Sequence, residues 1–205
     1  MKRILVVDDN PVITEILCRM IKQCGYEAVE LTSGEDTLEY LEREARPDLI
    51  FLDILMEPMD GWETLRRIKG DDRTREIPVI MITAKPLAPA ELEEYSSIIE
   101  DYIQKPIPRR ELSMLIDQFF RKKSALDDDM TRAKEKGADD ELVSEFRDLT
   151  REIEVRQRLI RLLKNVYVLP GDDLKKKAEI RAAIESMTIG LSELESRLSE
   201  VKDKL

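Results

Sequence analysis

Histidine is absent from the 205-residue chain. Its absence excludes a phosphohistidine relay, a histidine general base and any histidine metal ligand within this chain. Cysteine is scarce as well: Cys18 and Cys24 are the only two, and they lie six residues apart in a predicted helix. This spacing does not favour a structural zinc site. We expect two small, buried or half-buried thiol side chains in a reduced, cytoplasmic setting.

Long apolar runs are also missing from the sequence. No segment approaches the roughly 18 residues that a membrane-spanning helix needs. The first residues, Met1-Lys2-Arg3-Ile4, run directly into a predicted strand without the cleavage pattern of a signal peptide. We therefore expect no membrane insertion.

Charged residues, by contrast, are abundant. They make up 38% of the chain, and 34 basic against 44 acidic residues give a formal net charge of −10. An acidic surface repels the phosphate backbone of nucleic acids and the head groups of anionic membranes. The charge thus indicates that nucleic acid is not a partner.

Proline divides the chain into two unlike parts. Eight of the nine prolines lie at or before Pro108, and residues 109–169 contain none. The first part alternates short apolar runs with helical periods, whereas the second part has the pattern of helix almost throughout. We predict a first domain over residues 1–123 and a helical output or oligomerisation segment over residues 124–205.

Five short segments of the first part have the composition of β-strands. Three of them are nearly continuous apolar runs, which is typical of strands covered on both faces. Helical patterns separate them, one capped by Asn10 and others near 34–45, 61–69, 88–97 and from 107 onward. This alternation predicts right-handed crossovers and a doubly wound parallel α/β sheet. The predicted strands are Arg3–Asp8, Glu27–Leu31, Leu49–Asp53, Pro78–Thr83 and Tyr102–Lys105.

Four of these five strands end in chemically useful side chains. In an open parallel sheet, ligands bind beyond the carboxyl ends of the strands, at the point where the strand order reverses. In the flavodoxin-like order 2-1-3-4-5, the four strands are contiguous, so their ends would converge on one pocket. The side chains at these ends are Asp8, Asp9, Asp53, Thr83 and Lys105.

The chemistry of these groups points to a phosphoryl site. Three carboxylates in one pocket repel one another unless a cation binds or one carboxyl is protonated. An all-oxygen set favours a hard divalent ion, and Mg²⁺ is the usual one for phosphoryl groups. A carboxylate can act as a nucleophile and form an acyl phosphate. A hydroxyl and an ammonium group can position and neutralise the phosphoryl group.

In combination, the motifs of residues 1–123 resemble the receiver domain of two-component response regulators. The separations of Asp53 from Thr83 and from Lys105, 30 and 52 residues, also fit that family. One departure is Met56-Glu57-Pro58-Met59, where the family often has Met-Pro-Gly, so Glu57 adds negative charge near the site. The matching motifs are Val6-Val7-Asp8-Asp9, Leu52-Asp53, Met59-Asp60-Gly61, Ile82-Thr83-Ala84 and Lys105-Pro106.

The resemblance implies a phosphoacceptor and a metal site. Asp53 would accept a phosphoryl group from a partner histidine kinase. Asp9 and Asp53 would bind Mg²⁺ directly, together with the backbone carbonyl of Leu55. Asp8 would act through water or as a second ligand.

The resemblance also implies a switch. Thr83 would donate a hydrogen bond to the phosphoryl group, and Lys105 would pair with it. Tyr102 matches the aromatic switch position, and its ring would turn inward as Thr83 moves. The family is not enzymatic beyond autodephosphorylation. Asp60, which precedes Gly61, is better explained as a helix N-cap than as a ligand.

The second part predicts three helices. The first continues from Pro108 to about Lys136, where Gly137 offers a stop. The second runs to about Leu169, and the third follows a turn at Pro170-Gly171. The fold class is therefore an α/β receiver-like domain followed by an all-α helical hairpin or coiled coil.

Apolar stripes of heptad type run along the last two helices, and each stripe has one interruption, Arg156 in the first and Gly190 in the second. Neither helix can bury its stripe alone. An antiparallel hairpin, a three-helix arrangement and a four-helix homodimer are all compatible with this pattern. The stripes are Leu142, Phe146, Leu149, Ile153, Ile160, Leu163 and Tyr167, and Ile184, Met187, Leu191, Leu194, Leu198, Val201 and Leu205.

Taken together, the sequence favours a phosphoacceptor signalling switch that dimerises through its helical tail or its receiver. The alternative is a scaffold or adaptor whose tail binds a partner constitutively, with phosphorylation only tuning that binding. A third hypothesis is a phosphate sink, a protein whose main output is its own dephosphorylation. A DNA-binding regulator is not favoured, because the tail has no basic recognition surface.

Overall fold

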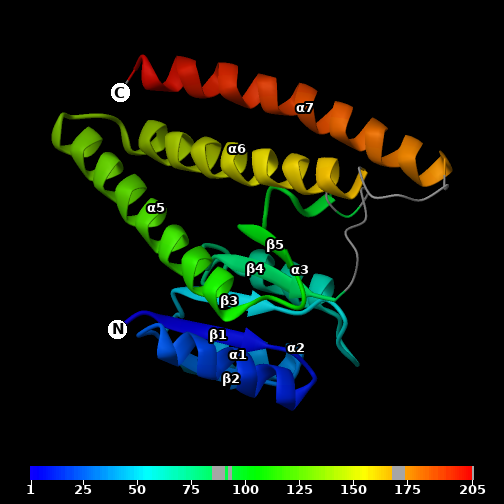
Figure 1. The fold of residues 1–205 in the computed structure, drawn as a ribbon. Helices are drawn as coiled ribbons and strands as arrows, with labels where there is room; N and C mark the ends of the chain where they lie inside the picture. Colours follow the sequence, from blue (N-terminus) through cyan, green and yellow to red (C-terminus); the bar gives the residue numbers. More distant parts are fainter. Residues whose placement is uncertain (85–90, 92–93, 168–173, 205) are drawn as a thin grey trace. The chain divides into compact units, whose positions relative to one another are not determined.

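The computed structural model describes most of the 205 residues (Figure 1). Part of the helix predicted at 88–97 and the turn predicted at Pro170-Gly171 lie outside the described residues. The described segments are 1–84, 91, 94–167 and 174–204.

The chain divides into two compact units that do not follow a single cut in the sequence. The first unit comprises Met1–Pro86 and Ile98–Ile116. The second comprises Leu87–Ser97 and Asp117–Leu205. An internal segment between two strands therefore belongs to the second unit.

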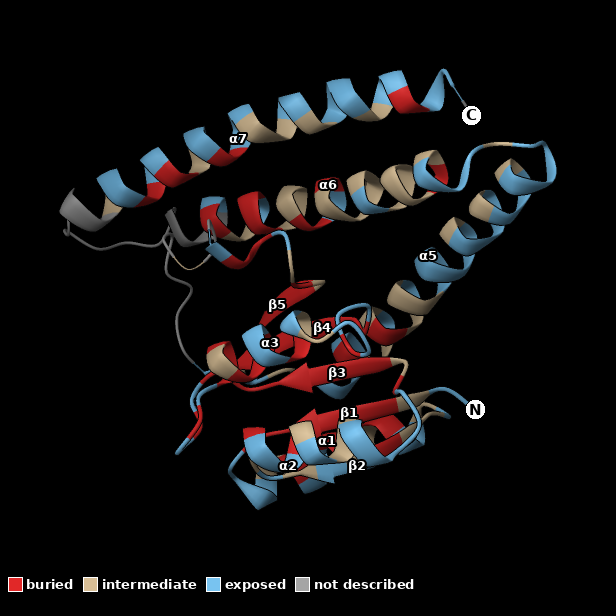
Figure 2. Ribbon diagram, turned by 180° about the vertical axis from the view of Figure 1, so that it is seen from behind, coloured by how far each residue is buried: buried red, intermediate tan, exposed pale blue. Residues whose placement is uncertain are grey.

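The first unit contains a five-stranded parallel sheet in the order β2-β1-β3-β4-β5, which confirms the predicted doubly wound topology. Every residue of β3 and β4 is buried, and so are four of the five residues of β1 (Figure 2). The sequences of these three strands are nearly continuous apolar runs, from which we predict that both faces of the sheet are covered at these strands. The strands are β1 (Arg3–Val7), β2 (Glu27–Leu31), β3 (Leu49–Leu52), β4 (Val79–Thr83) and β5 (Asp101–Gln104).

Three strands end one residue earlier than predicted. The backbone N–H groups of the next residues still extend the ladder: Asp53 donates to the carbonyl of Val7 at 2.9 Å, and Lys105 donates to that of Thr83 at 2.8 Å. Asp8 likewise donates to the carbonyl of Leu31 at 3.2 Å. Asp8, Asp53 and Lys105 are thus anchored by the sheet while their side chains lie beyond its edge.

Capped helices connect the strands, as the sequence predicts. The Asn10 side chain accepts a hydrogen bond from the Val12 N–H at 3.0 Å, and the Asp60 carboxylate accepts one from the Glu63 N–H at 2.7 Å. Both residues are therefore N-caps. The helices are α1 (Pro11–Gln23), α2 (Gly34–Arg43) and α3 (Gly61–Gly70).

The long helix α5 (Arg109–Glu135) begins in the first unit and ends in the second. Gly137, with φ +90°, follows it in the left-handed region that favours glycine. The Ala138 N–H donates back to the carbonyl of Ala133 at 3.0 Å, which closes the helix end. The predicted stop at Gly137 is confirmed.

The second unit contains an antiparallel pair of helices, α6 (Asp140–Tyr167) and α7 (Leu174–Lys202) (Figure 1). Polar contacts fix the pair along its length: Arg197 Nε lies 2.6 Å from Glu145 Oε1, and the Gln157 amide donates to Glu195 at 3.1 Å. The described side chains of the two predicted stripes are buried or half-buried, whereas the side chain of Tyr167 and the whole of Leu205 lie outside the described part. Buried side chains of the pair include Ile153, Ile160, Leu163, Met187 and Val201.

The two residues that interrupt the stripes lie opposite each other. A Cβ atom built on Gly190 would overlap Nη1 of Arg156. The guanidinium of Arg156 also pairs with Glu152 at 2.7 Å, while its buried Nε finds no hydrogen-bond partner among the described residues. Glycine therefore leaves the space that the guanidinium occupies between the helices.

Candidate functional site

Three residues predicted from the ends of three strands meet at one ammonium group. Lys105 Nζ lies 3.2 Å from Asp53 Oδ2 and also pairs with Asp8 Oδ2. Asp8 is 2% exposed and Asp53 is 6% exposed. Two buried carboxylates repel each other, and burial raises the free-energy cost of their negative charges. The ammonium group of Lys105 lowers this cost by pairing with both.

The backbone fixes the other oxygen of each carboxylate. Asp53 Oδ1 accepts a hydrogen bond from the Ile54 N–H at 2.8 Å, and Asp8 Oδ1 accepts one from the Asn10 N–H at 2.9 Å. One oxygen of each carboxylate is therefore held by the chain, and the second faces Lys105. This arrangement restricts the rotation of both side chains before any ligand arrives.

Thr83 and Tyr102 lie on the two neighbouring strands at the edge of this site. Thr83 is the last residue of β4 and is fully buried, and its carbonyl accepts the Lys105 N–H. Tyr102 pairs with Met81 in the register of β4 and β5 and is 4% exposed. The sheet thus brings Thr83 next to the lysine, as predicted. The roles of Thr83 and Tyr102 in switching stay predictions.

Asp9 and Leu55 are placed differently from the other predicted residues. Both are exposed, Leu55 at 53% of its surface. In the part of the chain that the structure describes, no three acidic or thiol side chains lie close enough together to enclose a metal ion. The part of Asp9 and of the Leu55 carbonyl in metal binding stays a prediction.

The donor atoms present at the site nevertheless suit Mg²⁺. The buried oxygens of Asp8 and Asp53 are hard ligands, and no sulfur or nitrogen ligand competes with them among the described site residues. Mg²⁺ is commonly held by one or two carboxylates, with water and phosphoryl oxygens completing its octahedron. Asp8 and Asp53 could supply that pair.

Gly61 is a supporting residue whose importance sequence reasoning missed. A Cβ on Gly61 would overlap the carbonyl oxygen of Asp53, and the Gly61 N–H donates to the carbonyl of Ile54 at 3.0 Å. The first turn of α3 is thus packed directly on the backbone that carries Asp53. The sequence signal was available in the Met59-Asp60-Gly61 motif, but only as a family likeness.

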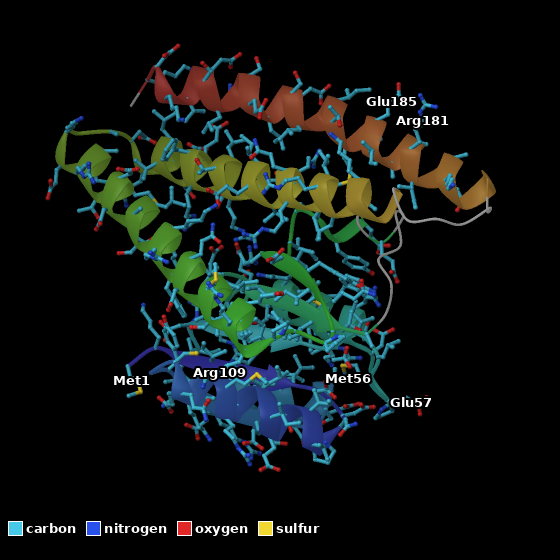
Figure 3. All side chains as sticks on the ribbon, viewed as in Figure 1. Met1, Met56, Glu57, Arg109, Arg181 and Glu185 are labelled. Carbon is cyan, nitrogen blue, oxygen red and sulfur yellow. The ribbon has the colours of Figure 1, made fainter. Side chains whose placement is uncertain are left out.

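The departure at Met56-Glu57-Pro58-Met59 lies in the loop between β3 and α3. Met56 is 4% exposed, whereas Glu57 is exposed at the outer edge of this loop (Figure 3). The added negative charge of Glu57 is therefore solvated rather than buried beside Asp53.

The cysteines take no part in the site. Cys18 is buried and Cys24 is half-buried, and both are free thiols, as predicted. Burial, together with the negative charge of Glu30, raises the pKa of the Cys18 thiol to about 12. This thiol is therefore protonated and unreactive near neutral pH.

Comparison with known families identifies both parts of the chain. Residues 4–117, over half of the chain, match the family described as "Response regulator receiver domain". The chain belongs to this family of two-component signalling proteins. Residues 122–205 match a second family, described as "Metanogen output domain 2".

Solved structures agree with this assignment. The chain is 52% identical to the N-terminal domain of a response regulator receiver protein from Methanoculleus marisnigri JR1, with a TM-score of 0.50 over 58% of this chain and 95% of that one. It is 30% identical to the receiver domain of the sensor histidine kinase PA1611 from Pseudomonas aeruginosa PAO1, with a TM-score of 0.51 over 57% and 95% of the two chains. That crystal structure has a magnesium ion coordinated in its active-site cleft.

Curated relatives are signalling proteins as well. The polar-differentiation response regulator DivK of Brucella anthropi is 37% identical over 106 residues, which are 52% of this chain and 85% of DivK. The chain spans about half the length of other curated relatives that it matches. None of the described helices is both long and apolar enough to cross a membrane.

Proposed function

We propose that this chain is a phosphorylation-controlled signalling switch whose acceptor is Asp53. The observation that carries the proposal is the ammonium of Lys105, shared by the buried carboxylates of Asp8 and Asp53. Asp53 has one oxygen held by the backbone and the other directed at this cation. Such a carboxylate is oriented as a nucleophile, and the compensating charge for an incoming phosphoryl group is already in place.

The transfer itself follows from these positions. A phosphohistidine of a partner histidine kinase loses its P–N bond as the Asp53 oxygen forms a P–O bond, and the departing imidazole nitrogen takes up a proton. Lys105 then pairs with the phosphoryl oxygens. Asp53 and Asp9, with the Leu55 carbonyl, would hold Mg²⁺ directly, and Asp8 would act through water or as a second ligand; the bound ion would neutralise the phosphoryl charge.

The readout uses the neighbouring strands. The Thr83 hydroxyl moves towards the acyl phosphate and donates a hydrogen bond to it. The ring of Tyr102 then turns inward into the space that Thr83 has vacated. Phosphorylation biases two pre-existing arrangements rather than creating a new one. Hydrolysis of the acyl phosphate resets the switch, and this autodephosphorylation is the only turnover that we propose.

Residues 1–123 receive the signal, and residues 124–205 act as the helical output and oligomerisation segment. The half-buried Leu194 and Leu198 and the exposed Ile189 of α7 support self-association through the tail, with the receiver as the alternative surface. A net charge of −10 argues against nucleic acid as the target. The two free thiols suit the reducing cytoplasm.

Phosphorylation by acetyl phosphate tests the assignment. With Mg²⁺ present, we expect the intact protein to gain the mass of one phosphoryl group, and we expect removal of Mg²⁺ by a chelator to prevent this gain. Asp53→Asn removes the nucleophile and should stay unlabelled. Asp60→Asn is the matched control, because asparagine caps a helix as well as aspartate, and it should label like the wild type. Equal labelling of Asp53→Asn and the wild type would defeat the proposal.

A further inference from the structure

The side of α7 that faces away from α6 carries one large apolar side chain. Ile189 is 60% exposed, and among the described residues of the second unit no other large apolar side chain is exposed in this way. It follows the buried Met187 of the seam by two residues, which turns it about 160° away from α6. Ile189 also lies close to the midpoint of α7, since this helix runs from Leu174 to Lys202.

Small side chains lie on both sides of Ile189 along the same face. Ala182 and Ser196 are seven residues before and after it, two helical turns in each direction, and both are exposed. The exposed side chains of Arg181 and Glu185 also point away from α6 (Figure 3). A second helix can therefore approach the backbone of α7 closely at positions 182 and 196.

The charges of the α6–α7 hairpin are separated along its length. Residues 151–188, which form the end where α6 leads into α7, contain nine basic and six acidic residues. Residues 140–150 and 189–204, which form the opposite end, contain four basic and eight acidic residues. A second copy turned end for end places its acidic end on the basic end of the first, whereas a parallel copy places like charges together. Exposed charges set the orientation of such a complex more than its affinity.

Ile189 and the charge pattern fit the same symmetry. In a twofold dimer both copies use the same surface, and a residue at the axis meets its own counterpart. An axis near the midpoint of α7 brings Ile189 against Ile189 of the partner subunit and lets the two helices overlap along their whole length. The exposed isoleucine then supplies apolar contact at the centre, and the charges at both ends are complementary.

We propose that α7 pairs with α7 of a second copy of this chain in antiparallel orientation, with Ile189 at the twofold axis. This inference rests on the proposed function, since it takes residues 124–205 as the oligomerisation segment, and it adds the helix, the face and the orientation. Because α7 keeps its seam with α6, the dimer contains four helices in the order α6-α7-α7-α6.

Disulfide trapping in the full chain tests the orientation. A Cys24→Ser background removes the half-buried thiol, and Cys18 stays protonated because burial raises its pKa to about 12. The thiols introduced by Ala182→Cys and Ser196→Cys face each other across the axis, so a mixture of the two variants should form a mixed disulfide under mild oxidation. Neither variant alone should cross-link, because its two thiols lie about 21 Å apart in the antiparallel dimer.

Two results of this trapping overturn the proposal. Cross-linking of Ala182→Cys with itself shows that the helices pair in parallel. A dimeric mixture that forms no cross-link places the interface elsewhere.

Ile189→Glu tests the axis itself. Glutamate is a good helix former, so the exposed position should tolerate it, while two carboxylates at the axis repel each other. We expect the dissociation constant of the dimer to rise about tenfold or more in analytical ultracentrifugation, with the helical circular dichroism unchanged. Ile16→Glu is the matched control, because Ile16 is an isoleucine of α1 that is 43% exposed, and it should leave the constant unchanged. An unchanged constant for Ile189→Glu, or an equal rise for Ile16→Glu, overturns the proposal.

The outcomes separate this inference from the proposed function. Phosphoryl uptake by Asp53 is measured on the same samples. If Asp53 is labelled and Ile189→Glu leaves the dimer intact, the proposed function stands and only the α7 interface fails. If the wild type is a monomer at every concentration tested, self-association fails together with this inference. If Asp53 is not labelled, the acceptor assignment fails, and the cross-linking still decides the interface.

Discussion

Gly61 shows how closely the backbone of the site is packed at the scale of single residues. Its missing side chain allows the first turn of α3 to approach the carbonyl of Asp53, with which any Cβ would overlap. The obstacle is backbone and not the end of a flexible side chain, so it cannot move aside cheaply. The position of Asp53 therefore depends on a residue that has no side-chain chemistry of its own.

Gly61→Ala should destabilise the receiver and disturb its site. We expect the free energy of unfolding to fall by about 2–4 kcal/mol, since either α3 or the Asp53 backbone must shift. Phosphoryl uptake from acetyl phosphate should slow as well. Gly70→Ala is the control, because no described atom lies within 4 Å of its Cβ position. Urea denaturation of the two variants makes the comparison, and similar stabilities would contradict this account.

The reactive residues of the site could be predicted from the sequence, whereas Gly61 could not. Asp53 and Lys105 each follow an apolar run, and parallel topology carries the ends of such runs to one edge. The need for glycine at position 61 depends on the distance between α3 and the chain after β3. That distance is set by packing in three dimensions and leaves no periodic signal in the sequence.

At the scale of elements, the pair α6–α7 depends on register. Periodicity predicted both stripes and both interruptions, Arg156 and Gly190. It did not predict that the two interruptions oppose each other, because the register of an antiparallel pair depends on the connection between its helices. Gly190 lowers the helix propensity of α7, but the absence of its side chain leaves space for the guanidinium of Arg156.

Gly190→Ala should therefore not give the usual gain of alanine over glycine in a helix, about 1 kcal/mol. The new Cβ displaces the guanidinium of Arg156 from its half-buried position, so we expect no gain or a loss in stability. In an Arg156→Ala background the same substitution should stabilise by about 1 kcal/mol. A double-mutant cycle by chemical denaturation measures the coupling. Additive effects of the two substitutions would show that the residues do not interact.

Strand ends show a smaller limit of sequence reasoning. Asp8, Asp53 and Lys105 were predicted as the last residues of their strands, but each lies one position beyond. Their N–H groups still donate to the neighbouring strand. A pattern of apolar and polar residues cannot distinguish a residue inside a ladder from one that only donates to it.

At the scale of the whole molecule, the chain forms two compact units, one that contains the receiver sheet and one that contains the helical pair. The change in proline content predicted two parts, 1–123 and 124–205, and that boundary stays a prediction. It did not predict that Leu87–Ser97 belongs with the helices, because those residues lie between two strands in the sequence. Membership in a unit is set by contacts and not by order along the chain.

The fragment 1–123 should fold and should accept a phosphoryl group at Asp53 as the full chain does. The receiver has its own buried core, and the N-terminal domain of the Methanoculleus relative has a crystal structure of its own. If the tail mediates self-association, light scattering should give a monomer for the fragment and a dimer for the full chain. A dimeric fragment would instead place the interface on the receiver, and an unfolded fragment would contradict the division at residue 123.

Leu87–Ser97 lies between two receiver strands in the sequence but belongs to the second compact unit. This limits how the receiver and the output can be recombined. A chimera joined in the middle of α5 would keep the buried Tyr95 and Ser96 in the receiver half and would discard the helices with which Leu87–Ser97 forms one compact unit. Grafting a foreign output onto this receiver, or this output onto another receiver, therefore requires that Leu87–Ser97 be exchanged together with those helices. The same requirement applies to gene fusions, in which receiver and output have to change as a matched pair at this position.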